Sequence, residues 1–400
     1  MNSAEAEQLR SFPPFGPAWA EERLFIDGDR YFLSLLEAIS RARSSIFMET
    51  YIFENDILGE RVLAALQAAA ERGVDVRLLV DGVGSAGWIS ESFASKGRVG
   101  FEVRVYHPLP WQLLSPWGWS QGPAMSLVLK LFSYANSRNH RKTTLIDGTI
   151  AFLGSLNVSD VHFEEARGRS RWHDVGVSVA GDGCMSLTDA FLRAWRRGWK
   201  VGGKGQLRPA LPLTSLPEKV LHSLVIRNDG RRLRHKALAR RLRQIRQARH
   251  RVWIANAYFV PSGPLLRALV AAARRGVDVR LLLPASSDVS FMPWVARAFY
   301  STLLKHGVRL FEYQPRILHA KVTLLDEHAT VGSSNLNHRS LLHDLEVDVV
   351  LRDEALLQDL QKMFEQDFLQ SREIQSSVSH PSSLWKNVVV RLLLYFRYVL

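Results

Sequence analysis

Two short motifs contain the residues of this chain best suited to catalysis. Both follow the pattern H-x-K-x-x-x-x-D, with His140, Lys142 and Asp147 in the first and His319, Lys321 and Asp326 in the second. On a β-strand, side chains two residues apart face the same side, so the histidine and the lysine of each motif are expected to project together. A phosphodiester is an anion that repels nucleophiles, and its cleavage needs positive charge, a nucleophile and a proton donor. Lysines supply the first and histidines the other two, so the motifs predict an enzyme that acts on phosphodiesters.

A second pattern, G-S-x-N, follows each motif. Its hydroxyl and amide groups are those of Ser155, Asn157, Ser333 and Asn335. We expect these groups to donate hydrogen bonds to the non-bridging oxygens of the phosphate. Since both halves carry the same residue types, the residues alone leave open which histidine attacks phosphorus and which carries the proton.

The aspartates that close the two motifs belong to the catalytic set by pattern, but their positions favour a structural role. Asp147 precedes Gly148, and this pair is typical of a two-residue hairpin turn. We expect Asp326 to occupy the matching turn.

Composition restricts the cofactor and the partner. Cys184 is the single cysteine, so neither an intrachain disulfide nor a cysteine-rich zinc site can form. No cluster of histidine and acidic residues has metal-ligand spacing, and we expect neither metal nor cofactor. The formal net charge is +13, which favours a polyanionic partner, although it can also serve solubility alone.

The chain repeats itself. The segment 71–80, ERGVDVRLLV, recurs at 274–283 as RRGVDVRLLL, each time after an alanine- and leucine-rich helical stretch. Apolar segments at 46–51 and 252–257 precede these units and are typical of buried strands. Several matches in the same order indicate duplication. We therefore predict an α/β fold of two duplicated sandwich domains with mostly parallel sheets, sharing one active site.

These repeats define the expected domains. The first repeat covers 1–200, with a tryptophan- and leucine-rich insertion near 108–135. A glycine- and proline-rich linker at 201–220 leads to the second repeat at 221–375. An amphipathic tail at 384–400 ends the chain.

This organisation resembles the phospholipase D superfamily from about Phe25 to Phe368. The resemblance implies a metal-free site in which His140 is the nucleophile and His319 the acid and base. It further implies that Lys142, Lys321, Asn157 and Asn335 hold the phosphate, and that a carboxylate after each motif orients a histidine. The candidates are Asp174 and Glu346, with Asp344 as a substitute for Glu346.

Within that superfamily the chain is most similar to the bacterial cardiolipin synthases of the shorter type, which lack two N-terminal transmembrane helices. The similarity lies in segments 49–53, 139–142, 258–261 and 335–340. It implies transfer of a phosphatidyl group between phospholipids, with phosphatidylglycerol as acceptor, at the cytoplasmic face of the bacterial membrane.

Three segments fit a peripheral contact with an anionic phospholipid surface. The helical stretch 231–251 is rich in arginine, segment 111–132 is rich in tryptophan and leucine, and the tail 384–400 mixes apolar residues with three cations. Each also has a plainer explanation, as a solvated or nucleic-acid-binding face, a local core, and a helix packed on the protein itself.

Three other functions remain open. A nuclease of the superfamily would use the same residues, but helix 231–251 lacks the aromatic residues that stack on bases, so nucleic acid is not the expected partner. A phospholipase would differ only in accepting water. A lipid-binding scaffold with a dead site would not need two complete motifs. The oligomeric state is left open.

Overall fold

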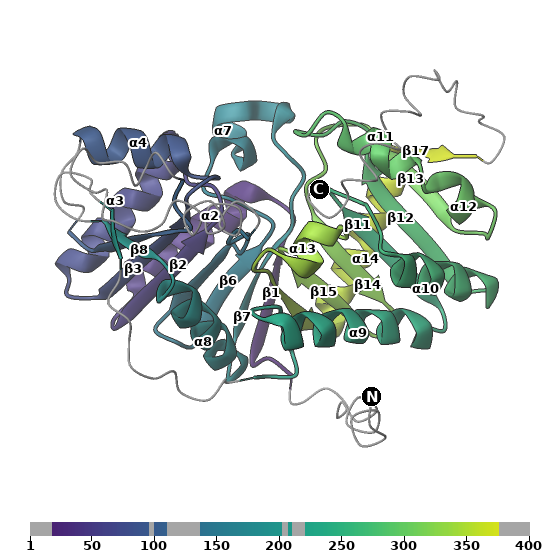
Figure 1. Ribbon diagram of the computed structural model, residues 1–400, viewed down its shortest axis with the longest axis horizontal. Coiled ribbons are helices and arrows are strands. Elements are labelled where there is room, and N and C mark those ends of the chain that lie inside the picture. Colours follow the sequence, from purple (N-terminus) through teal and green to yellow (C-terminus); the bar gives the residue numbers. More distant parts are fainter. Residues whose placement is uncertain (1–17, 96–99, 110–136, 202–206, 210–220, 376–400) are drawn as a thin grey trace, which may run out of the picture.

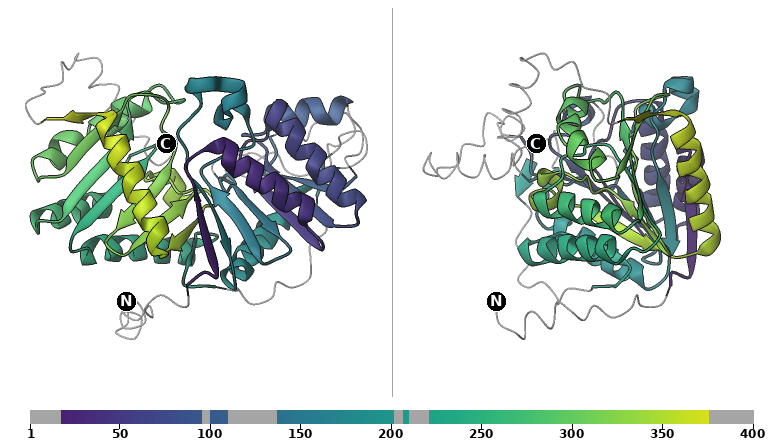
Figure 2. Two further views of the ribbon diagram at one scale, coloured as in Figure 1. Left: turned by 180° about the vertical axis from the view of Figure 1, so that it is seen from behind. Right: turned by 90° about the vertical axis from the view of Figure 1, so that its right-hand side faces the viewer.

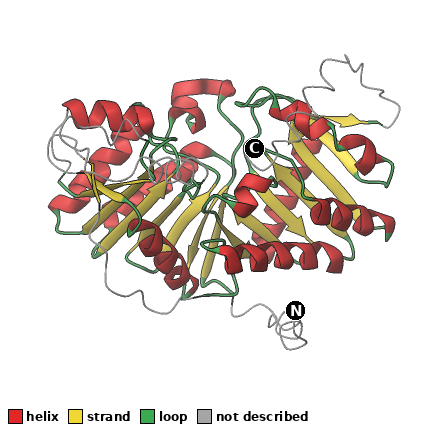
Figure 3. Cartoon of the chain, in the orientation of Figure 1, coloured by secondary structure: helices red, strands yellow, loops and turns green. Residues whose placement is uncertain are grey.

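The computed structural model describes residues 18–95, 100–109, 137–201, 207–209 and 221–375, and it consists of two halves of similar construction (Figure 1). The predicted tail at 384–400 and all but the first two residues of the insertion at 108–135 lie outside the described residues. Figure 3 shows that the strands form the middle of each half and that helices cover them.

The first half runs through an alternation of strands and helices. Its elements are β1 (Glu21–Phe25), α2 (Gly28–Arg41), β2 (Ser45–Thr50), α3 (Ile57–Glu71), β3 (Asp75–Asp81), α4 (Ala86–Ser95), β4 (Glu102–Tyr106), β5 (Thr143–Ile146), β6 (Ile150–Gly154), α7 (Glu164–Arg167), β7 (Gly176–Ala180), α8 (Gly183–Trp195), β8 (Trp199–Val201) and β9 (Leu207–Pro209).

The second half repeats this order. Its elements are β10 (Val225–Arg227), α9 (Arg231–Gln247), β11 (Arg251–Asn256), α10 (Gly263–Arg274), β12 (Asp278–Pro284), α11 (Met292–Arg297), α12 (Tyr300–Leu304), β13 (Arg309–Tyr313), β14 (Lys321–Leu325), β15 (His328–Gly332), α13 (His338–Leu342), β16 (Val347–Leu351), α14 (Glu354–Leu369) and β17 (Ser371–Ile374).

Each half is built on one sheet, and the strand orders correspond. The nine-stranded sheet has the order β1-β7-β6-β5-β2-β3-β4-β8-β9, and the eight-stranded sheet has the order β10-β16-β15-β14-β11-β12-β13-β17. The predicted duplication is therefore confirmed at the level of topology. Strands β8 and β9 extend the first sheet into the segment predicted as a linker.

The prediction of mostly parallel sheets is wrong. Among the strands that the structure describes, β2-β3-β4 and β11-β12-β13 pair in parallel, and the other neighbouring strands pair antiparallel. The reason is local: the motif strands β5 and β14 turn back through tight hairpins into β6 and β15. A strand that returns through a turn of two or three residues must pair antiparallel with the strand before it, whereas a helical crossover gives a parallel neighbour.

The repeated segment forms helix, turn and strand as predicted. Gly73 and Gly276 follow α3 and α10 with φ values of 89° and 86°. This left-handed conformation ends a helix and is open to glycine without strain. Strands β3 and β12 then start two residues later and lie in the middle of their sheets.

One hydrophobic core crosses the boundary between the halves. It includes residues from α8 and β7 of the first half together with residues from β16 and α14 of the second. Figure 1 shows α8 and α9 on the near face, and Figure 2 shows α2 and α14 on the far face, so each face carries helices from both halves. Among the described residues, no helix is long and apolar enough to cross a membrane.

Trp19 joins the two halves directly. Its ring, which is 6% exposed, packs against Gly183 of α8, where a Cβ atom would lie 2.3 Å from the ring. Its indole Nε1 donates a hydrogen bond of 2.9 Å to the carbonyl of Val350 in β16. The tryptophan therefore combines core packing with a bond across the boundary.

We expect Trp19→Ala to lower the free energy of unfolding by about 3–5 kcal/mol, because it opens a large cavity at the boundary. Trp19→Phe keeps most of the packing and loses the hydrogen bond, so its cost is about 1 kcal/mol. Thermal denaturation of both variants checks this order. Equal midpoints for wild type and Trp19→Ala would contradict a joining role.

Candidate active site

The two motif histidines meet where the halves pair through their backbones. The amide of His140 donates to the carbonyl of Leu345 at 3.0 Å, and the amide of His319 donates to the carbonyl of His173 at 2.8 Å. Isolated parallel bridges join Asn139 to Leu345 and His173 to Leu318. Each histidine is thus held beside the segment that carries the orienting carboxylate of the opposite half.

The carboxylates are exchanged between the halves. His140 Nδ1 lies 3.2 Å and 3.3 Å from the two oxygens of Glu346, and His319 Nδ1 lies 2.9 Å from Asp174 Oδ1. A carboxylate on Nδ1 fixes the tautomer and leaves Nε2 for chemistry. The sequence named both carboxylates but gave no sign that each serves the histidine of the other half.

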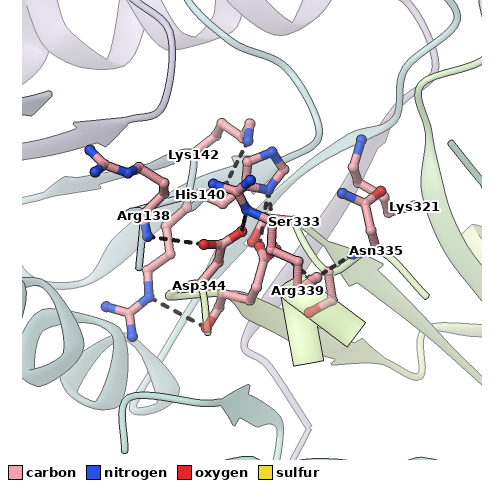
Figure 4. Close-up of polar contacts among 12 residues, drawn as sticks. Arg138, His140, Lys142, Lys321, Ser333, Asn335, Arg339 and Asp344 are labelled. Carbon is pink, nitrogen blue, oxygen red and sulfur yellow. Dashed lines mark hydrogen bonds and ion pairs between the residues drawn. The ribbon is translucent and has the colours of Figure 1, made fainter. Parts of the chain in front are cut away.

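Asp344 does not substitute for Glu346. Its oxygens accept from the backbone amide of Arg138 at 2.9 Å and from Arg339 Nε at 3.2 Å (Figure 4). It therefore fixes the chain next to His140 and holds Arg339 at the wall of the site.

A further side chain contacts each of these carboxylates, His162 for Asp174 and Ser340 for Glu346. Neither of them was predicted from the sequence. His162 accepts from the amide of Asn157 at Nε2 (3.1 Å), and its Nδ1 lies 2.9 Å from Asp174 Oδ2. In the second half, the hydroxyl of Ser340 accepts from the amide of Asn335 at 2.9 Å and donates to Glu346 at 2.5 Å. Both residues stand five positions after the asparagine, so aligning the repeats beyond the G-S-x-N pattern would have found them.

The lysines lie beside their own histidines, as the spacing predicts. Lys142 Nζ donates to the carbonyl of His140 at 2.7 Å, and Lys321 Nζ donates to that of His319 at 2.5 Å. Each ammonium also lies near a tyrosine ring, 5.2 Å from Tyr51 for Lys142 and 6.0 Å from Tyr258 for Lys321. These contacts place the two charges in corresponding positions of the two halves.

A cavity of about 430 Å³ opens onto the histidines. Polar and aromatic side chains of both halves line it, namely Tyr51, Arg138, His140, Asn157, Trp172, Tyr258, Asp288, His319, Asn335, Asn337, Arg339, Ser340 and Asp344. The side-chain oxygen Oδ1 of Asn157 accepts a hydrogen bond from the backbone amide of Ile52 at 3.2 Å, which leaves the side-chain NH₂ group for a ligand. Asn157 and Asn335 thus reach the cavity, as expected.

The two serines do not reach it, and their predicted role as phosphate donors is corrected. The Ser155 hydroxyl donates to the carbonyl of Val175 at 3.2 Å, and the Ser333 hydroxyl donates to that of Val347 at 3.3 Å. Both hydroxyls also accept from the amides of the same valines. They therefore secure the strands that follow Asp174 and Glu346.

Asp147 and Asp326 lie at the far ends of the motif strands from the histidines. Asp147 accepts from the backbone amides of Arg43, Ser44 and Ser45, and Asp326 accepts from those of residues 249–251. Asp147 has a φ of 51°, as a hairpin turn of this kind requires. Their place in the catalytic set is therefore corrected to the structural role that their turn positions favour: each ties the motif hairpin to the start of β2 or β11.

The arginine-rich helix is only partly a surface cluster. Arg234 donates to the carbonyl of His343 at 2.7 Å, and Arg241 pairs with the buried Asp348 at 2.9 Å. Arg234 thus attaches α9 to the end of α13, and Arg241 attaches it to β16, while Arg231, Arg232 and Arg246 stay exposed.

Comparisons with known proteins agree with this geometry. A family model described as "Cardiolipin synthase, PLD-like domain" matches residues 35–168 and 242–368. The chain belongs to this family. Cardiolipin synthase B of Escherichia coli (strain K12) is 34% identical over 352 residues, which span 84% of this chain and 78% of the relative. A cardiolipin synthase of Clostridium perfringens (strain 13 / Type A) is 29% identical over 86% of this chain and 69% of its own.

The fold also matches solved structures. A phosphatidylserine synthase of Haemophilus influenzae Rd KW20 superposes over the whole of both chains with a TM-score of 0.67 and 14% identity. A polyphosphate kinase of Porphyromonas gingivalis matches 94% of this chain and 56% of its own, with a TM-score of 0.54 and 16% identity. At these identities the likeness concerns the fold alone.

Within the described residues, one acidic cluster has the spacing of a metal site, and its residues do not line the cavity. It consists of Asp27, Asp29 and Glu164. The guanidinium of Arg171 pairs with all three carboxylates. The cluster already binds this cation, and we assign no metal to it.

Electrostatics make the two histidine pairs of this family member unequal. Burial alone would raise the pKa of Asp174, but His319 and His162 outweigh it and hold that pKa well below its usual range. Burial raises the pKa of Glu346 to about 7, with Lys142 opposing the shift. Asp174 is thus a permanent anion, whereas Glu346 exchanges its proton near neutral pH.

Burial also lowers the pKa values of the cations. Those of Lys142 and Lys321 fall to about 7 and about 8. Burial and Lys321 lower the pKa of His319 to about 4, and burial with both lysines holds that of His140 well below its usual value. Without an anion in the cavity, both histidines are therefore neutral at pH 7.

Asp174→Asn should reduce turnover of a soluble p-nitrophenyl phosphodiester by roughly 10²–10⁴-fold, since an amide cannot stabilise an imidazolium. Glu346→Gln should cost less, because Glu346 is already partly protonated near neutral pH. Steady-state rates with folded variants check this order. Asp359→Asn, which removes an exposed carboxylate on α14, is the matched control and should leave the rate unchanged. A larger loss for Glu346→Gln than for Asp174→Asn would contradict the assignment.

Anion binding should weaken as the pH rises. The two lysines lose their protons through about pH 7 and 8 and Glu346 loses its proton at about 7, so each titration makes the cavity more negative. We expect the dissociation constant of dimethyl phosphate, whose own charge is fixed, to rise at least about ten-fold between about pH 6 and pH 9. Isothermal titration at constant ionic strength measures it, and a flat profile would contradict these protonation states.

Proposed function

We propose that this chain is a cardiolipin synthase-like phosphatidyltransferase, which moves a phosphatidyl group from one phospholipid to the headgroup hydroxyl of another. The observation that carries the proposal is the pair of buried histidines with exchanged carboxylates, which face one cavity with a lysine beside each. Membership of the cardiolipin synthase family supports the same activity.

In the first step, His140 Nε2 attacks phosphorus and forms a phosphohistidine. Its neutral state without substrate and the orientation from Glu346 suit a nucleophile. Lys142, Lys321 and the amides of Asn157 and Asn335 surround the phosphate oxygens, where charge accumulates in the transition state. The leaving alcohol takes its proton from His319.

The unequal carboxylates support this division of roles. The permanent anion Asp174 stabilises a positive charge on His319, which must alternate between imidazolium and imidazole. A bound phosphodiester anion adds to that stabilisation and raises the proton affinity of His319 in the complex. Glu346, with its higher pKa, favours a neutral His140 instead.

In the second step, the hydroxyl of an acceptor lipid attacks the phosphohistidine. His319 Nε2 accepts the hydroxyl proton, the P–N bond to His140 breaks, and a P–O bond forms. The histidine returns to its neutral state, so the cycle consumes no cofactor. Water in place of the lipid hydroxyl would give hydrolysis at the same site.

The surroundings of the cavity favour a lipid over a nucleic acid. Apolar side chains also line it, including Val83, Val289, Phe291 and Met292. Such a wall suits the glycerol backbone and the first acyl carbons of a phospholipid. Phosphatidylglycerol is the proposed acceptor, and a phospholipase of the same lipids is the second candidate.

We place the protein at the cytoplasmic face of the bacterial membrane as a peripheral protein. Support comes from the exposed cations Arg231, Arg232 and Arg246 on α9 and from the composition of the insertion 108–135 and the tail 384–400. Cations near an anionic surface gain about 1 kcal/mol each.

Phosphatidylglycerol vesicles test the proposal. The full chain should convert labelled phosphatidylglycerol to cardiolipin and glycerol, resolved by mass. A rapidly quenched reaction should carry the phosphatidyl adduct on the peptide that contains His140. His140→Ala should lose the adduct, and His319→Ala should lengthen its lifetime when the leaving group is good. Phosphatidic acid as the only lipid product would favour the phospholipase, and an adduct on His319 would reverse the two roles.

A further inference from the structure

The cavity carries a carboxylate for which the reaction described above gives no task. Asp288 lies in the loop between β12 and α11 and lines the cavity together with His319. Its Oδ2 accepts from the hydroxyl of Tyr258 at 2.5 Å, and its Oδ1 accepts from that of Ser287 at 2.9 Å. A negative charge beside a site for an anion weakens anion binding, so Asp288 suits a neutral hydrogen-bond donor better than a second anion.

Asp288 differs in its partners from the other carboxylate that lines the cavity. Asp344 is bound by Arg339 and by a backbone amide. Asp288 accepts from two neutral hydroxyls, and no salt bridge to it occurs among the described residues. Asp288 is exposed to solvent. Partial desolvation by the surrounding walls would raise its pKa, but His319 and the two hydroxyls outweigh that effect, so its carboxylate is ionised.

The position of Asp288 connects it to one step of the reaction. Tyr258, whose hydroxyl donates to Asp288, also contacts His319: the two rings lie in an edge-to-face arrangement with their centroids 6.1 Å apart. His319 is the group that receives the proton of the incoming alcohol, so that alcohol must stand on the His319 side of phosphorus. Asp288 therefore lies beside the alcohol and not beside the nucleophile.

The repeat offers no counterpart for this carboxylate. Where the second half has Ser287 and Asp288 after β12, the first half has Gly84 and Ser85 after β3, and Gly84 lines the cavity near His140. Asp288 therefore distinguishes the side of the cavity next to His319, where the alcohol binds, from the side next to His140.

We propose that Asp288, held by Tyr258, binds a second hydroxyl of the acceptor alcohol and thereby selects vicinal diols such as a glycerol headgroup. The proposal rests on the phosphatidyltransfer proposed above and names its acceptor class. The acceptor's terminal hydroxyl attacks phosphorus and gives its proton to His319, while the neighbouring hydroxyl donates to Asp288. A hydroxyl fits better than an ammonium group, since two lysines and two arginines in the same site disfavour a further cation.

Competition between acceptors tests this choice. A soluble short-chain phosphatidyl-p-nitrophenol is the donor, and 1,2-propanediol, 1-propanol and 2-aminoethanol are present at equal concentration. All three compete for one phosphohistidine, so the product ratio reports the second step alone, and effects on the first step cancel. Mass spectrometry quantifies the three phosphatidyl alcohols.

The wild type should favour the diol over 1-propanol, and Asp288→Ala should lower that ratio about ten-fold, as for the loss of a charge-assisted hydrogen bond. Asp288→Asn, which keeps an acceptor oxygen but loses the charge, should give an intermediate ratio. Ser286→Ala changes the same loop without touching Asp288 and should leave the ratio unchanged.

An unchanged ratio in Asp288→Ala would overturn the assignment while leaving the transferase intact. A preference for 2-aminoethanol that disappears in Asp288→Ala would instead assign the subsite to a cation. If the wild type formed no phosphatidyl alcohol from any acceptor, the transferase itself would be refuted, and the acceptor subsite with it.

Discussion

The exchange of carboxylates between the halves is the constraint on which the rest of the structure depends. Each histidine is hydrogen-bonded to an acid that the opposite half supplies, over 2.9 Å for Asp174 and 3.2–3.3 Å for Glu346. A half on its own would contain a histidine without its acid and an acid without its histidine. The site can therefore form only when the two sheets dock, and the shared core around α8 and α14 maintains that docking. A buried acid that lost its partner would carry a desolvation cost of several kcal/mol, so docking and site assembly stabilise each other.

Symmetry explains how such a site can arise, and small departures from it explain how it can work. Two equal histidines would compete for the same role. Here the group behind the acid is a histidine in one half and a serine in the other, and the acids differ in length and in pKa. The shorter aspartate faces the longer His162, and the longer glutamate faces the shorter Ser340, so both halves span a similar distance with different electrostatics. The pseudo-two-fold backbone thus provides the positions, and four side chains assign the tasks.

The sequence predicted the pairing of each histidine with its lysine, the duplication and the identity of both acids that contact the histidines, because these depend on residue type and on spacing along a strand. It could not predict the exchange of acids, which depends on how two sheets dock. The prediction of mostly parallel sheets was wrong because a buried strand has the same apolar sequence pattern whether its neighbour is parallel or antiparallel. The hairpin signal at Asp147-Gly148 was the one indication of an antiparallel pair in the sequence analysis. The prediction for Ser155 and Ser333 was wrong because a hydroxyl near an asparagine suggests a donor to the phosphate. Both hydroxyls instead hydrogen-bond to the backbone of a neighbouring segment. Asp288 was missed because it lies in a loop outside any motif, where position in three dimensions and not spacing gives it meaning.

The charges of the site before substrate binds follow from the burial of its ionisable groups. Two ammonium groups with pKa values of about 7 and about 8 stand beside a glutamate with a pKa of about 7, so the net charge of the site is small near neutral pH. This limits the cost of burying charge while the cavity holds no substrate. A phosphodiester that enters brings a negative charge into the same volume, favours the protonated form of every one of these groups, and so draws protons from solvent as it binds. Substrate binding and proton uptake are therefore coupled, and in the proposed mechanism the proton that His319 gives to the leaving alcohol is taken up together with the substrate anion.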